Sequence, residues 1–263
     1  MLDQTQAETA AGLILEHWQT GSQMDALPDA LRPAARGEGY AIQAQLEAAS
    51  RSALFGWKIA ATSEGGQQHI GVDGPLAGRL LAERLIAAEH APSLNGNHMK
   101  VAEPEFAFRM AQSLPPRSAV YGREEVLAAV GDLHLAIELP SSRFLDFASV
   151  GAPQLIADNA CAHQFLLGPR VEDGWRGLDL SRHPVTATVA GKLTEEGSGG
   201  AVHGDPRDAL AWLVNEVSGL GLTLESGQVV TTGTCTTPLA IAPGDRVLAD
   251  FGALGRVELQ LAD

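Results

Sequence analysis

Residues 101–108 read Val-Ala-Glu-Pro-Glu-Phe-Ala-Phe, and this stretch gives the first indication of the fold class. Its acidic and apolar residues alternate, which predicts a β-strand, because successive side chains of a strand point to opposite faces. Glu103 and Glu105 therefore share one face of the strand. Two neighbouring carboxylates repel each other unless a cation joins them. Pro104 has no backbone donor, which predicts that this strand lies at a sheet edge or contains a bulge.

A second strand, predicted over residues 133–139, supplies a third carboxylate. Glu138 interrupts the otherwise apolar stretch Leu-His-Leu-Ala-Ile-Glu-Leu, where an unpaired charge needs a partner. Three carboxylates with no Cys or His in the pattern suit a hard cation, Mg²⁺ or Mn²⁺ rather than Zn²⁺. These residues alone leave two interpretations open. In one, Glu103, Glu105 and Glu138 bind a metal; in the other, the first two form a solvated edge and Glu138 pairs with an arginine.

The segments around these strands predict an α+β fold. The spacing of apolar residues predicts helices over residues 7–18, 40–52 and 205–220. Short β-rich segments separated by Gly, Pro and Asp are predicted at residues 55–61, 185–190, 229–232, 247–251 and 256–261. Many short strands with few helices favour a rolled sheet or barrel over a βαβ sheet. We therefore expect an N-terminal helical region, residues 1–54, followed by a β-rich domain, residues 55–263.

Composition and charge argue against several classes of protein. The chain has 263 residues, of which 45% are hydrophobic and 19% charged, a balance typical of a globular protein. A formal net charge of −14 argues against a nucleic-acid partner, which requires a basic surface. The apolar runs are too short to span a bilayer, so no membrane association is expected. The N-terminus shows no signal-like apolar stretch, which predicts a cytoplasmic protein whose Cys161 and Cys235 stay reduced.

Lys58 is the main candidate for a catalytic group besides the carboxylates. It lies in the apolar strand predicted over residues 55–61, where it is either a surface lysine or part of a site. In a site, its charge could hold a substrate carboxylate or enolate, or it could transfer a proton. His69 and His163 are weaker candidates for accessory groups.

Seven short motifs occur in order along nearly the whole chain. They are Gly56-Trp-Lys58-Ile-Ala-Ala-Thr62, Ile70-Gly-Val-Asp73-Gly-Pro-Leu76-Ala-Gly78, Glu103-Pro-Glu105, Ala136-Ile-Glu138, Ala157-Asp-Asn159-Ala, Thr232-Gly-Thr234 and Pro243-Gly-Asp245. This ordered set resembles the 2-keto-4-pentenoate hydratase / 4-oxalocrotonate decarboxylase group of the fumarylacetoacetate hydrolase superfamily. The resemblance implies a mixed β-roll or barrel of the fumarylacetoacetate hydrolase type and a homo-oligomer. It also implies a Mg²⁺ ion on Glu103, Glu105 and Glu138 in the β-roll domain.

The resemblance also implies roles for individual residues. Lys58 is expected to be catalytic, and the expected substrate-binding residues are Ile70, Leu76, Asn159 and Thr234. Leu76 departs from the hydratases of the group, which carry an acidic residue there that is thought to act in proton transfer or water activation. The decarboxylases tend to carry an apolar residue at this position. With Leu76 in place, water activation would fall to Lys58 or to the metal site.

The resemblance therefore implies a lyase acting on a small 2-oxo acid. The first hypothesis is a Mg²⁺-dependent hydratase that adds water to a 2-hydroxy-2,4-dienoate in the catabolism of aromatic ring-cleavage products. The second is a decarboxylase of a 2-oxo-3-enedioate, which Leu76 favours. The third is a non-catalytic subunit that pairs with a true enzyme of the group, although the intact carboxylates and Lys58 count against it. A divalent cation serves either reaction by polarising the 2-oxo acid and stabilising its enolate.

Overall fold

Six α-helices and two sheets form the part of the chain that the computed structural model describes, residues 2–87 and 89–263. The helices are α1 (Gln4–Thr20), α2 (Arg36–Ala48), α3 (Glu64–His69), α4 (Arg123–Ala128), α5 (Ala152–Ala157) and α6 (Pro206–Gly219). The strands are β1 (Gly56–Ala60), β2 (Leu76–Leu80), β3 (Val101–Met110), β4 (Val130–Leu139), β5 (Gln164–Arg170), β6 (Pro184–Val189), β7 (Leu193–Ser198), β8 (Val229–Thr234), β9 (Leu239–Ala240), β10 (Arg246–Asp250) and β11 (Arg256–Gln260). The α+β class predicted from the sequence is confirmed. In these described ranges, no helix has the length and apolar character needed to cross a membrane.

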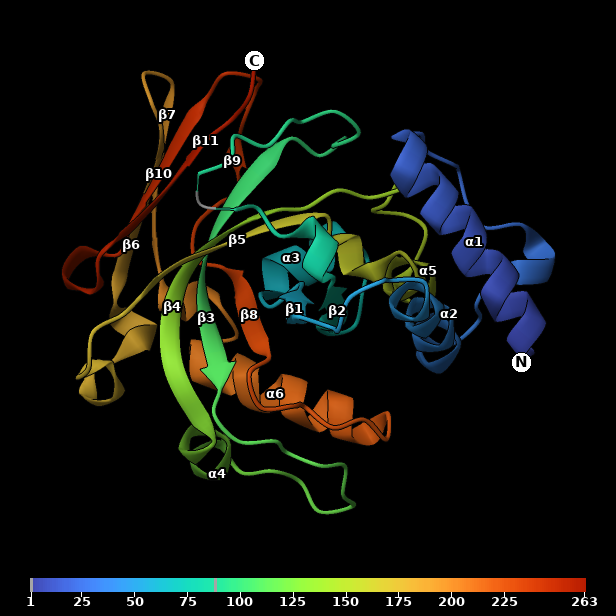
Figure 1. The fold of residues 1–263 in the computed structure, drawn as a ribbon, viewed down its shortest axis with the longest axis horizontal. Coiled ribbons are helices and arrows are strands. Elements are labelled where there is room, and N and C mark those ends of the chain that lie inside the picture. The colour runs from blue at the N-terminus through green and yellow to red at the C-terminus, as the bar shows by residue number, and fades with distance from the viewer. Residues whose placement is uncertain (1, 88) are drawn as a thin grey trace.

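The N-terminal helices form where the sequence provides caps and an apolar face. The Asp3 carboxylate accepts from the Gln6 N–H and the Gln6 side chain accepts from the Asp3 N–H, so a capping box begins α1. Gly21 ends α1 with a left-handed φ of 66°. Both helices lie at one end of the molecule (Figure 1) and pack in a core of their own. Its buried residues are Ala7, Ala10, Ala11, Ile14, Trp18, Leu27, Ile42, Leu46, Leu81, Phe144 and Ala157. This core includes residues on both sides of position 54.

β3 lies inside the larger sheet and connects most of its parts. That sheet has seven strands in the order β2-β1-β8-β3-β4-β5, and β9 pairs with β3 beside this path. β1 and β8 run parallel, whereas β3 runs antiparallel to β4, β8 and β9. The smaller sheet has four antiparallel strands in the order β11-β10-β6-β7 and lies at the end of the molecule opposite α1 (Figure 1). Over the described residues neither sheet closes on itself, so the sheets are rolled and open rather than a barrel.

Pro104 corrects one part of the prediction for β3. It lies inside the sheet and not on an edge strand. Its missing N–H is tolerated because the ladder between β3 and β8 shifts register between Glu105 and Ala107, as expected for a bulge. The Pro104 carbonyl accepts instead from the Cys235 N–H at 2.8 Å. The sequence predicted either an edge position or a bulge for this strand, and the bulge is confirmed.

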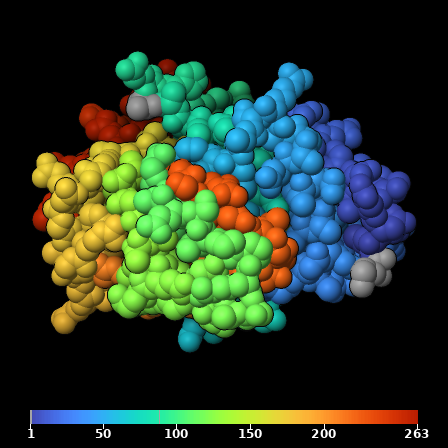
Figure 2. Space-filling view, turned by 60° about the horizontal axis from the view of Figure 1, so that its bottom comes forward, coloured from blue at the N-terminus to red at the C-terminus, as the bar shows by residue number. Residues whose placement is uncertain are grey.

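α6 packs against β8 and links two distant parts of the chain. On the face shown in Figure 2, α6 (orange) lies between the segment around α4 (green) and the N-terminal region (blue). The Tyr40 hydroxyl on α2 donates to the Glu216 carboxylate at 2.7 Å. Arg123 on α4 forms an ion pair with Asp208 at 2.8 Å. The first contact joins α2 to α6 and the second joins α4 to α6, so α6 connects both helices to the sheet that carries the predicted site.

Candidate metal centre and active site

The two predicted strands bring the three glutamates together. β3 and β4 pair so that Glu103 lies directly opposite Glu138, and Glu105 follows two residues later on the same face of β3. One carboxylate oxygen from each of the three lies within 4.8 Å of the other two. Glu105 and Glu138 are fully buried, whereas Glu103 is half-buried. The geometry is that of a group of oxygens that could hold a single ion.

The pKa shifts of the three glutamates indicate that this cluster carries more negative charge than the neighbouring Lys58 offsets. Burial and the neighbouring charge of Glu138 raise the pKa of Glu103 to about 7. Burial, together with the charges of Glu138 and Glu103, raises the pKa of Glu105 well above its usual range. Burial also raises the pKa of Glu138, although the ammonium of Lys58 opposes the shift. A divalent cation would relieve this mutual repulsion.

Hydrogen bonds leave part of the cluster without a partner. Glu105 Oε2 accepts from the Thr231 hydroxyl and from the Gly233 N–H, the latter at 2.8 Å. Glu105 Oε1 and Glu138 Oε2 have no hydrogen-bond partner among the described residues, and Glu138 Oε1 has only the Lys58 ammonium at 3.2 Å. Buried oxygens without partners are unfavourable, and their presence needs an explanation. An all-oxygen donor set with unpaired oxygens fits a cation that prefers oxygen ligands, such as Mg²⁺ or Mn²⁺.

Gly233 is needed at this point of β8. Its φ of 104° is a conformation that residues with a side chain rarely adopt. A Cβ atom here would also overlap the Thr62 hydroxyl. The bare backbone lets the Gly233 N–H reach Glu105 and fix the orientation of its carboxylate.

Lys58 lies beside the carboxylates and not at the surface. Its side chain is 3% exposed, and its Nζ lies 3.2 Å from Glu138 Oε1. Nζ also donates to the Ala160 carbonyl at 3.0 Å. Burial would lower the pKa of Lys58, but the charges of Glu138, Glu103 and Glu105 outweigh it and raise the pKa above its ordinary value. The structure therefore places a buried ammonium next to the candidate metal ligands.

A strained turn presents the Ala160 carbonyl to Lys58. Asn159, Ala160 and Cys161 have φ values of 56°, 49° and 61°, in the left-handed region that is unfavourable for residues with a Cβ. Asn159 holds this turn against β2, because its amide donates to the Arg79 carbonyl at 2.8 Å and accepts from the Arg79 N–H at 2.6 Å. Asn159 was expected to bind substrate, but its amide is engaged with the backbone of β2.

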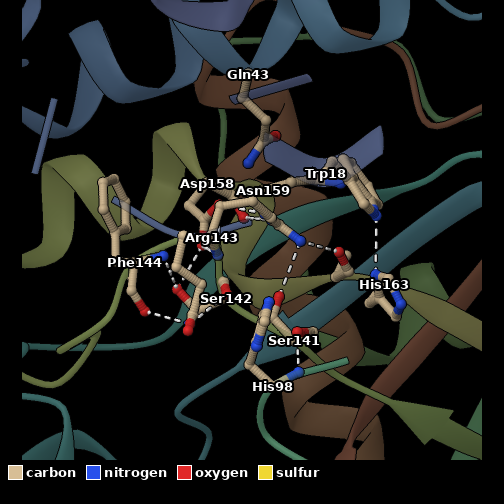
Figure 3. Close-up of polar contacts among 12 residues, drawn as sticks. Trp18, Gln43, His98, Ser141, Ser142, Arg143, Phe144, Asp158, Asn159 and His163 are labelled. Carbon is tan, nitrogen blue, oxygen red and sulfur yellow. Dashed lines mark hydrogen bonds and ion pairs between the residues drawn. The ribbon is translucent and has the colours of Figure 1, made fainter. Parts of the chain in front are cut away.

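A buried ion pair holds the other side of the same turn (Figure 3). The Arg143 guanidinium donates to the Asp158 carboxylate and to the Ala162 carbonyl, the latter at 2.9 Å. The Ser142 hydroxyl donates to the same carboxylate at 2.7 Å. Asp158 and Arg143 are 0% and 3% exposed, so water cannot replace either partner. The turn that orients Lys58 is therefore fixed by charge on one side and by Asn159 on the other.

His163 belongs to the packing of α1 and not to the site. The Trp18 indole N–H donates to His163 Nδ1 at 2.8 Å, as Figure 3 shows. Burial and the charges of Arg143 and Arg84 lower the pKa of His163 to about 3, so the ring stays neutral. The accessory role suggested for His163 is thus replaced by that of a hydrogen-bond acceptor in the core.

We expect Asp158→Ala to destabilise the protein by about 3–5 kcal/mol, because the change leaves the buried Arg143 guanidinium without its partner. Urea unfolding followed by circular dichroism measures this difference in the free energy of unfolding. Asp25→Ala, at an exposed carboxylate, is the control and should shift stability by less than about 0.5 kcal/mol. Equal unfolding midpoints for the two variants would contradict the role given to the ion pair.

A cavity of about 880 Å³ leads to the cluster. Of the predicted site residues, Lys58, Ile70, Glu103 and Thr234 line it, and so does His69. The Thr234 hydroxyl donates to the Thr236 carbonyl at 2.9 Å, so its proton is already engaged.

Leu76 and Asn159 do not line this cavity. Leu76 lies on β2 opposite Ala60, is 0% exposed and packs in the main core. The apolar residue at this position therefore does not form part of the cavity wall.

Sequence reasoning did not identify the groups that orient the site. Thr231 and Gly233 hold Glu105, and the Ala160 carbonyl holds Lys58. The one available signal was the position of Thr231 within a predicted strand that runs into the Thr-Gly-Thr motif. Cys161 and Cys235 are free, as predicted, and both are buried. Burial raises the pKa of the Cys161 thiol to about 12, which argues against a nucleophilic role.

Comparison with known proteins gives matches over nearly the whole chain. A profile described as "Fumarylacetoacetate (FAA) hydrolase C-terminal" matches residues 90–262. A 2-keto-4-pentenoate hydratase of Paraburkholderia xenovorans is 29% identical over 258 residues, 97% of this chain and 94% of that protein. A 4-oxalocrotonate decarboxylase of a Pseudomonas species is 27% identical over 227 residues, 86% of this chain and 84% of that protein.

The fold is also that of a solved structure. The 4-oxalocrotonate decarboxylase from Pseudomonas putida G7, complexed with magnesium and adipate, superposes with a TM-score of 0.90. The match covers 99% of both chains at 22% sequence identity. This likeness confirms the predicted fold.

Proposed function

The chain belongs to the fumarylacetoacetate hydrolase family, and from this premise we propose that it is a Mg²⁺-dependent lyase that adds water to a 2-hydroxy-2,4-dienoate. The observation that carries the proposal is the group of three carboxylates with unpaired buried oxygens beside a buried lysine, at the end of a cavity. The hydratase relative, similar along nearly its full length, supports the choice of reaction.

Each charged residue of the site has a proposed task. Glu103, Glu105 and Glu138 would hold Mg²⁺, which when bound would supply the Lewis acidity that polarises the carboxylate and the C2 oxygen of the substrate. Lys58 keeps a positive charge at the buried end of the cavity, where it can hold the negative charge that develops on the C2 oxygen. Glu138 and the Ala160 carbonyl restrict Nζ to one position. Glu103 and Lys58 are the charged residues among the described lining residues, and Glu103 would bind the metal. We therefore assign to Lys58 the transfer of protons to and from the carbon chain of the substrate.

We also propose the wider organisation of the protein. Residues 1–54 would be a helical region and residues 55–263 the catalytic domain, since every residue of the candidate centre lies in the second part. The protein would act on a small 2-oxo acid as a homo-oligomer in the cytoplasm.

Decarboxylation of a 2-oxo-3-enedioate is the second candidate function. Sequence likeness to a 4-oxalocrotonate decarboxylase over 86% of the chain favours it. The other ground for it is Leu76, an apolar residue where the hydratases of the group carry an acidic one, although the Leu76 side chain is buried in the core and does not line the cavity. Hydration and decarboxylation are both lyase reactions, so the two candidates share a class.

Turnover of two substrates separates these candidates. The purified protein is incubated with Mg²⁺ and 2-hydroxypenta-2,4-dienoate, and separately with 2-oxohex-3-enedioate, with EDTA-treated protein as the control. We expect the ultraviolet absorbance of the dienoate to fall as 4-hydroxy-2-oxopentanoate forms, with no CO₂ and only in the presence of Mg²⁺. Release of CO₂ from the enedioate without hydration would support the second candidate. Turnover of neither compound would contradict both and favour a non-catalytic subunit.

A further inference from the structure

The Lys58 ammonium has two acceptors that differ in kind. Its Nζ lies 3.2 Å from Glu138 Oε1 and donates to the Ala160 carbonyl at 3.0 Å. Glu138 would bind the metal in the proposed function, so the Ala160 carbonyl is the acceptor that the metal does not share. The position of the ammonium therefore depends on where this backbone carbonyl lies.

The turn that carries the Ala160 carbonyl needs support from the residues around it. Asn159, Ala160 and Cys161 all have left-handed φ values, although none of them is glycine. A residue with a Cβ keeps this conformation only where surrounding contacts hold it. The contacts of the turn therefore decide where the carbonyl points.

Asn159 anchors the turn to the open edge of β2. In the described chain β2 is the outermost strand of the larger sheet, with β1 on its other side. The Asn159 amide accepts from the Arg79 N–H and donates to the Arg79 carbonyl, the two kinds of bond that a further strand would make there. Asn159 is 0% exposed and does not line the cavity. Its side chain is therefore engaged with the strand and is not available to a substrate.

Gly78 brings the turn and Lys58 against the same point of β2. A Cβ atom at Gly78 would lie 2.4 Å from the Asn159 carbonyl oxygen and 3.0 Å from Cγ and Cδ of Lys58. Only a residue without a side chain leaves room for both groups at these distances. The backbone of the turn and the methylene groups of Lys58 therefore pack together over Gly78.

Gln43 supports the same edge of β2 from α2. Its amide donates to the Ala77 carbonyl of β2 at 2.9 Å and to the Ile156 carbonyl of α5 at 2.8 Å. Gln43 is 0% exposed, and both amide side chains are drawn in Figure 3. α5 leads into the turn, so Gln43 holds the segment before the turn and Asn159 holds the turn itself.

We propose that Asn159 is a positioning residue for the Lys58 ammonium. By binding the backbone of Arg79, it fixes the turn so that the Ala160 carbonyl meets Nζ of Lys58. Asn159 acts through this carbonyl and does not touch the substrate. The consequence for catalysis rests on the proposed function, in which Lys58 is the catalytic residue.

Asn159→Gly tests the kinetic consequence. The change removes both hydrogen bonds to Arg79, and glycine adopts a φ of 56° without strain, so the protein should still fold. We expect kcat for 2-hydroxypenta-2,4-dienoate to fall about 10–100-fold, the effect of a small misplacement of a catalytic group. KM and the Mg²⁺ affinity should stay unchanged, because Asn159 contacts neither the cavity nor the carboxylates. Asn159→Asp keeps the acceptor for the Arg79 N–H and should lower kcat by less.

Asn215→Gly is the matched control. The Asn215 amide on α6 accepts from the Tyr121 N–H at 2.8 Å and donates to the Tyr121 carbonyl at 3.1 Å, the same arrangement outside the cavity. Glycine inside a helix is itself destabilising, so this variant should lose stability in urea unfolding. It should nevertheless keep the kcat of the unmodified protein.

The reactivity of Lys58 tests its position without relying on turnover. The chain contains three lysines, Lys58, Lys100 and Lys192, so peptide mass spectrometry can follow each one during reductive methylation with formaldehyde and cyanoborohydride. EDTA-treated protein is used, so that no metal contributes. Loss of two hydrogen bonds should raise the methylation rate of Lys58 about tenfold relative to Lys100 and Lys192 in Asn159→Gly. Asn215→Gly should leave this ratio unchanged.

Two results would overturn the positioning role. One is a Lys58 methylation rate that Asn159→Gly does not change, and the other is a loss of kcat matched by an equal loss of Mg²⁺ affinity. Absence of turnover by the unmodified protein would overturn the proposed function instead. The methylation rates would still decide whether Asn159 positions the ammonium, so the two failures are distinguishable.

Discussion

Glu138→Gln is expected to weaken Mg²⁺ binding by at least roughly 100-fold, more than the change of a residue that only supports a metal ligand. Glu138 is fully buried, its Oε1 lies 3.2 Å from the Lys58 ammonium, and its Oε2 has no partner among the described residues. Glutamine keeps the shape of the side chain but removes its charge and turns one oxygen into a donor. Titration calorimetry with Mg²⁺ measures the loss of affinity directly.

Thermal unfolding gives an independent measurement of the same change. An ion that binds the folded protein alone stabilises it by about 2.7 kcal/mol at a concentration 100 times the Kd. The unmodified protein should therefore melt at a higher temperature with Mg²⁺ than with EDTA, and Glu138→Gln should lose this difference. Glu124→Gln, an exposed carboxylate on α4, is the control and should keep it. A Glu138→Gln protein that bound Mg²⁺ as tightly as the unmodified one would contradict the metal centre.

The strands of the site could be predicted from the sequence because the alternation and apolar runs that indicate a strand involve only neighbouring residues. Alternation around Glu103 and Glu105 predicted β3, and an apolar run predicted the part of β4 that carries Glu138. The pairing that places Glu103 opposite Glu138 depends on a register set by the whole sheet. No short segment encodes that register, so the residue pattern alone left the grouping of the three carboxylates open, and the resemblance favoured it.

The direction of single side chains was the least predictable feature. Leu76 and Asn159 both lie in motifs that resemble the family, yet Leu76 points into the core and the Asn159 amide binds the backbone of β2. A motif gives the order of residues but not the face on which each one lies. The partners of Lys58 were missed for a related reason, since one of them is a backbone carbonyl in a strained turn. Every residue has a backbone carbonyl, so the role of a backbone carbonyl cannot be predicted from the residue type.

Lys58→Met separates catalysis from metal binding. We expect kcat for hydration to fall roughly 10²–10⁴-fold, the range typical of a positioned proton-transfer group. Methionine fills similar space but removes the ammonium that lies 3.2 Å from Glu138. Because the ammonium competes with the metal for the same negative charge, Mg²⁺ should bind Lys58→Met at least as tightly as the unmodified protein.

Separate effects on kcat and on Mg²⁺ affinity distinguish a catalytic lysine from a structural one. A lysine needed only to hold the carboxylates together would, when replaced, lose Mg²⁺ affinity and turnover together. A catalytic lysine loses turnover alone. Lys192→Met, at a lysine whose side chain is 55% exposed, is the matched control and should change neither quantity, because neither Lys192 nor its ion-pair partner Asp245 lines the cavity. Unchanged kcat in Lys58→Met would contradict the catalytic role, and loss of Mg²⁺ binding would assign Lys58 to the support of the metal ligands instead.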